Sequence, residues 1–516
     1  MASKGQEKQF VFVGGPMLTT KGSGIRSKLI QDTIRKNKLQ RQTKTLADMN
    51  KLLKDTYIST YGPLITEGSV QDLGSRVFDP LIPVEELTSQ LKVREIFSFA
   101  SRHIFPNLRL GEVTTDLYNA WAFPLDDKLK LFSFLWSSKY QEDVLRLTYE
   151  APVDPAGLKE QFTLKGLTLM ALRNEASTYT GQKPIDSIIM CMLVLAVHET
   201  ASERIYREPS PFSPMFTGLH ALDLYGSRNY NPRHWKVLHE LLGKYGGLES
   251  LRTFGLGWQI SLADLTNSAH TLRKPICSLV DVYGRKIDLD PPLVRFAPYG
   301  GGLSPTGAEQ KPGSGFNELL CLQPPVHENV VTVFSHVGEL SYVIHYLSMQ
   351  PCGPRLLDFL ADSRDLIHHR LFSQPDETDT PDQILQLNDQ IYNKSLQRSL
   401  EIYQITRLTM LIYATHVTFP LPQSTVVRGP LCQLCPRIQA LAAQGASSPL
   451  LLWCASVVLI ALEGSKPSNE ILILFQQLCR DLEVTSLETL LGILRYFAWV
   501  DSAVDHHYSG IWKDLF

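Results

Sequence analysis

The 516-residue sequence predicts an all-α protein, a large helical array that follows a basic N-terminal arm. From about residue 84 onward, apolar residues recur three and four positions apart, as they do along one face of an α-helix. No run of alternating apolar and polar residues is long enough to predict a sheet. Hydrophobic residues make up 44% of the chain and charged residues 20%, which is ordinary for a globular protein long enough to bury a large core.

The predicted arm covers residues 1–60 and is strongly basic. Residues 1–54 contain nine Lys and three Arg against three acidic residues, whereas the whole chain has a net charge of −2. A basic arm on an acidic body favours a negatively charged partner or nuclear import, and the alternative is a solvated, disordered N-terminus. If the arm contacts DNA, the candidate contacts are Arg26, Lys28, Arg35, Lys36, Lys38 and Arg41.

The helical domain is predicted for residues 84–516, after a linker at residues 55–80 that is rich in Gly, Ser, Thr and Pro. Pro184 and Asp186 suit the first turn of a helix, where a missing N–H costs nothing and a carboxylate meets the helix dipole. The helices expected in the first part of the domain are 84–105, 125–138, 164–178 and 185–200.

Turn residues divide the rest of the domain. Gly246-Gly247 predicts the end of a helix, with one glycine in the left-handed conformation. Residues 284–326 contain Pro and Gly clusters and predict a large loop or mobile flap, and residues 373–382 predict a shorter acidic loop. Helices are predicted at about 327–348, 354–372, 383–417, 449–463, 468–483 and 486–500.

The C-terminal segment combines an apolar helix, opened by Pro449 and closed near Gly464, with several aromatic side chains. Trp453, Val457 and Ile460 repeat at four and three positions and form an apolar stripe on that helix. The stripe predicts a packing surface for the last helices of the chain. The aromatic residues expected to pack on it are Tyr496, Phe497, Trp499 and Trp512.

Residues 218–275 hold a second ordered set of residues. Gly218-Leu219-His220-Ala221-Leu222 comes first, Lys244-Tyr245-Gly246-Gly247 follows, and a helix with Asp264 comes last. With the C-terminal segment, this order resembles the regulatory domain of fungal-specific transcription factors of the second type. In that family a His-bearing helix, a helix ending in Gly-Gly and a helix with one Asp usually follow one another, with Arg rather than Lys-Tyr before the glycines.

The resemblance, over roughly residues 84–516, implies a nuclear regulator of transcription whose helical domain takes part in activation, homo- or hetero-dimerisation and ligand response. Related proteins often control a pathway or a biosynthetic (secondary metabolite) gene cluster. The family usually carries a zinc cluster of six closely spaced cysteines, but the first cysteine here is Cys191. Three explanations stay open: an upstream exon encodes the cluster, a partner protein binds DNA, or the arm itself contacts DNA.

No metal or cofactor is predicted. Cys432 and Cys435 have the spacing of half a zinc site without a second pair, so core or surface thiols are expected. The adjacent pairs His368-His369 and His506-His507 point about 100° apart on a helix, which does not suit chelation, and solvated surface histidines are expected.

The sequence also argues against an enzyme. A terpene synthase needs carboxylate-rich magnesium motifs, but Lys128 follows Asp126-Asp127, and Asn388-Asp389 lacks the hydroxyl and glutamate that should follow. The alternative that stays open is a small-molecule-binding or enzymatic helical protein on the same scaffold, without DNA binding. Asp264 and Asp501 are expected to be buried carboxylates that pair with a cation or cap a helix.

No membrane segment is predicted. The apolar runs at 188–197 and 450–462 are shorter than the roughly 20 residues that span a bilayer, so they are expected to be core helices. The first twelve residues lack the apolar core of a signal peptide. The predicted location is the nucleus.

Overall fold

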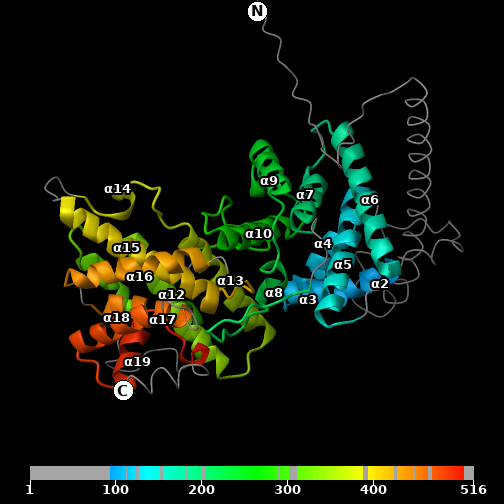
Figure 1. Cartoon of the computed structure of the whole chain (residues 1–516). Coiled ribbons are helices and arrows are strands. Elements are labelled where there is room, and N and C mark those ends of the chain that lie inside the picture. The colour runs from blue at the N-terminus through cyan, green and yellow to red at the C-terminus, as the bar shows by residue number, and fades with distance from the viewer. Residues whose placement is uncertain are drawn as a thin grey trace, which may run out of the picture. The chain divides into compact units, whose positions relative to one another are not determined.

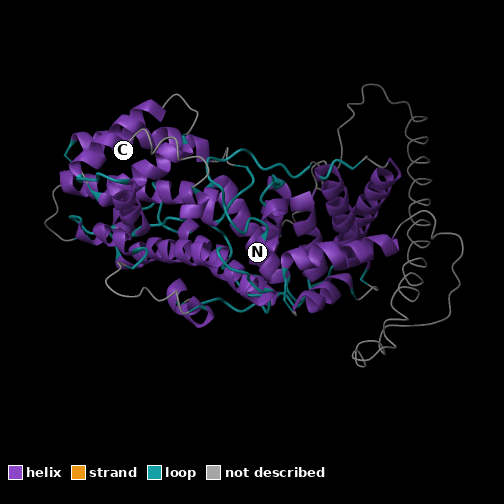
Figure 2. Cartoon of the chain, turned by 90° about the horizontal axis from the view of Figure 1, so that it is seen from below, coloured by secondary structure: helices purple, strands orange, loops and turns teal. Residues whose placement is uncertain are grey.

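The computed structural model confirms the all-α prediction, and the part of the chain that it describes contains no β-strand (Figure 2). The described residues form two isolated antiparallel β-bridges, one between Val280 and Lys286 and one between Val326 and Leu385. The structure describes residues 93–504 except 112, 124–126, 152–154, 182, 199–203, 289, 301–310, 388–392, 424–426, 446–447 and 463–467. The predicted arm, the predicted linker and Trp512 therefore lie outside the described residues.

The first helices pack around α5, which is almost entirely buried. Asp127 begins this helix, because its side chain accepts a hydrogen bond from the Lys130 N–H at 3.0 Å. Helices α2, α6 and α7 contact α5, and Figure 1 shows α5, α6 and α7 side by side. The elements are α2 (Val93–Phe99), a π-helical turn (Ala100–Ile104), α3 (Phe105–Leu108), α4 (Val113–Ala122), α5 (Lys128–Thr148), α6 (Pro155–Thr178) and α7 (Asp186–His198).

The middle of the chain consists of shorter elements. The Gly246-Gly247 helix stop is confirmed: Gly246 has φ +101°, and the N–H groups of both glycines bond the Leu242 carbonyl at the end of α9. The elements are a 3₁₀ turn (Leu219–Ala221), α8 (Leu222–Tyr225), α9 (Pro232–Tyr245), α10 (Leu256–Thr271) and α11 (Pro292–Phe296).

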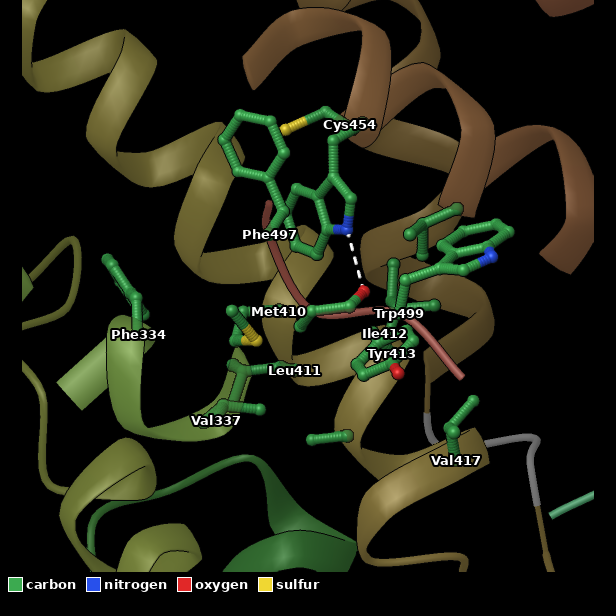
Figure 3. Close-up of a cluster of buried hydrophobic side chains, with 14 of the residues drawn as sticks. Phe334, Val337, Met410, Leu411, Ile412, Tyr413, Val417, Cys454, Phe497 and Trp499 are labelled. Carbon is green, nitrogen blue, oxygen red and sulfur yellow. Dashed lines mark hydrogen bonds between the residues drawn. The ribbon is translucent and has the colours of Figure 1, made fainter. Parts of the chain in front are cut away.

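The C-terminal helices enclose the largest hydrophobic core. Its centre is α17, in which every residue from Leu450 to Ile460 is buried. Helices α15, α16, α18 and α19 contact α17, and Figure 3 shows Cys454 of α17 and Phe497 among the buried side chains of this core. The elements are α12 (Glu328–Ser348), α13 (Pro354–Phe372), α14 (Pro381–Ile384), α15 (Asn393–Tyr413), α16 (Arg428–Ala443), α17 (Pro449–Ala461), α18 (Ser468–Asp481) and α19 (Leu487–Arg495).

The predicted loop at 284–326 is partly wrong. Residues 292–299 and 314–321 form short helical segments, because Phe296, Phe316 and Leu319 are fully buried in the core and fix the chain there. The helix predicted at 383–417 begins only at Asn393, after the separate short helix α14. The helix predicted at 486–500 ends at Arg495, so Phe497 and Trp499 lie beyond it. Helices α4 and α16 have no counterpart among the predictions.

The two apolar runs are core helices, as predicted: α7 and α17 are buried along almost their whole length. Among the described residues, no helix combines the length and the apolar character needed to cross a bilayer.

Candidate functional site

The proposed DNA contacts of the arm, from Arg26 to Arg41, lie outside the described residues. Within the helical body, polar side chains gather at one buried place, where α3, the turn Leu219–Ala221 and α13 meet. We take this network and the cavity beside it as the candidate functional site.

The centre of the network is the ion pair between Arg364 and Asp365 on α13. Arg364 donates to Asp365 Oδ1 from Nε at 2.8 Å, and its Nη2 lies 2.7 Å from the same oxygen. The other carboxylate oxygen, Oδ2, accepts the Nδ1 proton of His220 at 2.6 Å. Both charged side chains are at least 97% buried, so the pair is held away from water.

Arg109, just after α3, adds a second cation to the network. Its Nη1 donates to Asp362 Oδ1 at 2.6 Å and faces His220 Nε2 at 3.3 Å. Its guanidinium also lies over the Trp258 ring, 5.4 Å from the centroid. Asp358 completes this side by accepting the N–H groups that follow Arg109, those of Leu110 and Gly111, at 2.9 and 2.8 Å.

The backbone at His220 departs from the predicted helix. His220 and Ala221 have φ values of +51° and +52°, in the left-handed region that costs free energy for residues with a Cβ. The expectation of a His-bearing helix is therefore wrong: the residue sits in a strained turn. The hydrogen bond to Asp365 and the contact with Trp258 hold the ring in place and compensate for that strain.

The electrostatics keep Asp365 ionised. Burial alone would raise the pKa of its carboxyl, but the Arg364 guanidinium and the hydrogen-bonded His220 ring lower that pKa to about 2. A neutral Asp365 would leave Arg364 buried without a counter-charge, so the three groups behave as one unit.

An internal cavity adjoins the network. The centre of a water molecule can occupy about 70 Å³ of this cavity. The cavity wall is mostly apolar and aromatic. The aromatic side chains come from α3, α4, α5, the segment 225–230 and the segment after α15, which are far apart in sequence. They are Phe105, Trp121, Phe134, Tyr225, Tyr230 and Phe419.

Four polar side chains in the cavity wall have a buried atom without a hydrogen-bond partner among the described residues: Arg364 Nη1, Gln259 Nε2, His198 Nε2 and Tyr230 Oη. Arg364, Gln259 and His198 are at least nine-tenths buried. An unsatisfied buried polar group costs about 1–3 kcal/mol, so this cluster indicates a place where a ligand or ordered water supplies the missing partners.

The protonation of His198 follows from its surroundings. Burial and the nearby Arg228 guanidinium lower the pKa of this ring to about 3, and the Val194 carbonyl opposes the shift only in part. The ring is therefore neutral at pH 7. Since Nδ1 lies 3.2 Å from the Val194 carbonyl oxygen, Nδ1 carries the proton and Nε2 is a hydrogen-bond acceptor.

The site is better suited to binding than to acid–base catalysis. An arginine N–H can only donate, so His220 Nε2 accepts from Arg109 while Nδ1 donates to Asp365. Both ring nitrogens are thus engaged, and this histidine has no lone pair left for a substrate proton. The chemistry that remains open is hydrogen bonding by Arg364, Gln259 and His198.

The predicted carboxylates behave differently from each other. Asp501 pairs with Arg495, as expected, with Nε 3.1 Å from Oδ2, but it is half-buried rather than buried. Asp264 is buried but accepts the N–H groups of Ile276 and Cys277, at 2.6 and 2.7 Å, where the chain turns back after α10. Its other oxygen, Oδ1, lies 3.6 Å from His239 Nε2, and burial lowers the pKa of that ring, so a neutral histidine and two backbone N–H groups stand where a cation or a helix cap was expected. Burial raises the pKa of this carboxyl to about 6, although both N–H groups oppose the shift.

The prediction for the first histidine pair is also wrong. His368 is fully buried, with Nδ1 2.6 Å from the Arg364 carbonyl oxygen and Nε2 2.8 Å from Thr418 Oγ1. His369 is half-buried and bonds the Cys277 carbonyl at 2.7 Å. The helix that carries them is covered by neighbours on this face, so the side chains find protein partners instead of water. The pair His506-His507 lies outside the described residues.

The described part of the chain holds no group of three or more His, Cys, Asp or Glu side chains arranged to bind a metal ion. Cys432 is exposed and Cys435 is buried, which agrees with the expected surface and core thiols.

Comparison with known proteins adds no relative: no protein-family model, no curated protein and no solved structure matches this chain. The resemblance to the fungal regulatory domains therefore stays a prediction.

Of the site residues, His220 and Gln259 lie in the segment 218–275 that was recognised from the sequence, but no role was predicted for Gln259. His198 carries no sequence signal, because a polar residue in an apolar helix looks the same whether its partner is protein or ligand. Arg364 and Asp365 give a weak signal, since two adjacent charges interrupt the apolar face of α13.

Proposed function

We propose that this protein is a regulator of transcription whose helical domain binds a small molecule. The basic arm and the resemblance in residues 218–275 and 449–516 support a role in transcription. The DNA contact is made by the arm or by a DNA-binding partner. A biosynthetic gene cluster is the target that the resemblance favours.

The observation that carries the ligand-binding part is the cavity with its buried polar atoms that have no partner among the described residues. Pockets for small molecules are mostly apolar, with a few polar groups that fix the orientation of the ligand. Here the apolar wall comes with Arg364, Gln259 and His198 as such groups. A molecule that satisfies them stabilises the folded state, and the stabilisation grows with the logarithm of its free concentration above the Kd.

In the proposed function, ligand binding at this site changes the conformation of neighbouring elements. Arg364 lines the cavity and also bonds Asp365 and the Leu219 carbonyl, so it joins the ligand site to the strained turn. A ligand that accepts a hydrogen bond from Arg364 weakens or shifts the bonds that Arg364 makes to Asp365 and to the Leu219 carbonyl. In the proposed function, that change alters the position of the turn and of α13, and so the surface that a partner meets.

Two measurements on the tagged full-length protein test this proposal. Chromatin immunoprecipitation should enrich discrete promoters, and mass spectrometry of the native purified protein should find a small molecule at about one per chain. Ala263→Phe, which places a large ring in the cavity wall, should lose the bound molecule and change the expression of the enriched genes. Uniform background on chromatin would overturn the role in transcription, and a wild-type protein free of any bound molecule would overturn the ligand site.

The second candidate is a small-molecule-binding protein without a role at DNA. The cavity favours it equally, because nothing in the cavity depends on the arm. A bound molecule combined with exclusion from the nucleus would select this candidate.

A further inference from the structure

We infer that the cavity selects a neutral, largely apolar molecule that carries a carbonyl oxygen, in preference to an organic acid or a plain hydrocarbon. This inference rests on the ligand site of the proposed function and names the chemical class that the site accepts.

The polar groups of the cavity call for a hydrogen-bond acceptor. Arg364 Nη1 and Gln259 Nε2 can only donate, and both are without a partner among the described residues. A carbonyl oxygen can accept a hydrogen bond from either donor without bringing a charge into the interior. Since buried donors cost free energy when unpaired, a ligand with such an oxygen gains more than one without it.

The charge of the network argues against an anionic ligand. Arg364 and Arg109 already face three carboxylates, those of Asp358, Asp362 and Asp365, at short range. A ligand carboxylate would add a fourth negative charge beside Asp365, in a place where the ionised form of an acid is expensive to bury. The charge of Arg364 is already balanced by Asp365, so Arg364 meets a ligand as a hydrogen-bond donor and not as an unpaired positive charge.

The rest of the wall defines the body of the ligand. Aromatic rings such as Phe105, Phe134 and Phe419 favour a flat apolar group that packs against them. His198 Nε2 is an acceptor, so a hydroxyl group elsewhere on the ligand would find a partner there. A hydroxylated aromatic ketone has all three features, and the carbonyl is the one that the two donors require.

The experiment is calorimetric titration of the full-length protein with three probes of nearly equal size: 2-acetylnaphthalene, 2-naphthoate and 2-ethylnaphthalene. They offer a neutral carbonyl, an anionic carboxylate and no polar group. The ketone should bind at least about tenfold more tightly than the hydrocarbon, because it pairs a buried donor that the hydrocarbon leaves unpaired. The naphthoate should bind more weakly than the ketone at pH 7.

A variant pair ties the preference to the cavity. Gln259→Leu removes one donor and keeps an apolar wall, so it should reduce the affinity for the ketone several-fold and leave that for the hydrocarbon nearly unchanged. Gln374→Leu is the matched control, because Gln374 is also buried but does not line the cavity. It should change neither affinity.

The outcomes separate the two levels of the proposal. If the naphthoate binds most tightly, or if ketone and hydrocarbon bind equally well, the ligand class is wrong and the ligand site stands. If none of the probes binds, this inference fails. If in addition the native protein carries no small molecule, the ligand site of the proposed function fails with it.

Discussion

His220 donates its Nδ1 proton to Asp365 at 2.6 Å and so joins two segments that lie 145 residues apart in the chain. The bond ties the strained turn at Leu219–Ala221 to α13. Because Asp365 also neutralises Arg364, one carboxylate supports the turn, the buried guanidinium and the wall of the cavity at once.

Asp365→Ala should therefore be strongly destabilising. The substitution leaves Arg364 buried without its counter-charge, a change that typically costs about 3–5 kcal/mol. Asp501→Ala is the matched control, because Asp501 pairs with a half-exposed Arg495, and exposed pairs are worth about 1 kcal/mol or less. Thermal melting of both variants checks the prediction. Equal melting temperatures for the two variants would show that the buried network contributes little.

The stability of the fold should fall as the pH is lowered from about 7 to about 4. Burial lowers the pKa of four histidines below the value of about 6.5 that they have in the unfolded chain. Below pH 6.5 the unfolded state thus binds more protons than the folded state, and protonation favours unfolding. Their pKa values in the fold are about 3 for His198 and about 4 for His270, His368 and His416.

Carboxyl groups modify this profile, and Asp264 and Asp365 have the largest shifts in pKa among them. The pKa of Asp264 is raised to about 6, so its protonation stabilises the fold as the pH falls from about 6 to about 4, but one such group is outweighed by four histidines. The pKa of Asp365 is lowered to about 2, so its contribution is complete above about pH 4 and is lost toward pH 2. Melting temperatures measured from pH 7.5 to 4.5 test the slope. His368→Gln should melt lower than the wild type at pH 7.5, and the gap should narrow at pH 5; a gap independent of pH would contradict the assignment.

Substitution by alanine at two helical glycines should change the free energy of unfolding in opposite directions. A Cβ at Gly338 in α12 would lie 2.5 Å from Gly313 Cα and 2.6 Å from the Phe497 carbonyl oxygen, so Gly338→Ala should cost about 1–3 kcal/mol through overpacking. Gly166 in α6 is exposed and has open space around it, so Gly166→Ala should stabilise by about 1 kcal/mol through helix propensity. Chemical denaturation of the two variants measures both signs. A neutral Gly338→Ala would show that α12 does not approach the other segments so closely.

Much of the helical framework follows from local sequence. Helices α12, α13 and α17 begin and end within two residues of the predicted positions, because proline or a polar residue marks each start and the apolar spacing continues to the end. The predictions failed where tertiary packing decides. Phe316 and Leu319 turn part of an expected loop into a helical segment, and Phe497 lies past the end of its helix, because each side chain fills space in a core built from distant segments.

The candidate site was hardly predictable. His220 lies in the recognised segment Gly218–Leu222, but its left-handed backbone depends on Asp365, which lies far along the chain. His198 and Gln259 are candidate ligand contacts because one nitrogen of each side chain has no hydrogen-bond partner among the described residues. A single sequence does not show which buried nitrogen will lack a partner. The basic arm presents the reverse case: its charge is plain in the sequence, and its residues lie outside the described part of the chain.

Deletion of residues 21–44 should abolish nuclear enrichment of a fluorescent fusion. The segment carries most of the basic residues of the arm, including the six proposed DNA contacts, and clusters of Lys and Arg are the usual import signal. Replacing those six residues by Gln in the full chain should have the same effect without altering length. An unchanged nuclear fraction in both variants would remove the arm from the proposed function.

Phe497 should be one of the main supports of the C-terminal core. Its ring stacks on Trp453 with centroids 5.9 Å apart and meets Phe316 edge-on at 5.1 Å, while Trp453 Nε1 donates to the Ala498 carbonyl at 2.9 Å. This arrangement confirms that Phe497 packs on α17. Phe497→Ala should cost about 3–5 kcal/mol, as aromatic-to-alanine changes in packed cores do.

The neighbouring aromatics show whether this role is structural. Tyr496→Ala, at a half-buried position, should cost clearly less than Phe497→Ala because less apolar surface is lost. Trp499 is 4% exposed but lines a surface groove, and its Nε1 has no partner among the described residues, so Trp499→Phe keeps most of the packing and removes only a donor that a bound partner would use. In all three variants, regulatory output measured with a reporter should fall only as far as protein abundance falls. A variant with wild-type melting behaviour and no reporter activity would instead mark that side chain as a contact for a partner, because a packing residue cannot lose function while the fold keeps its stability.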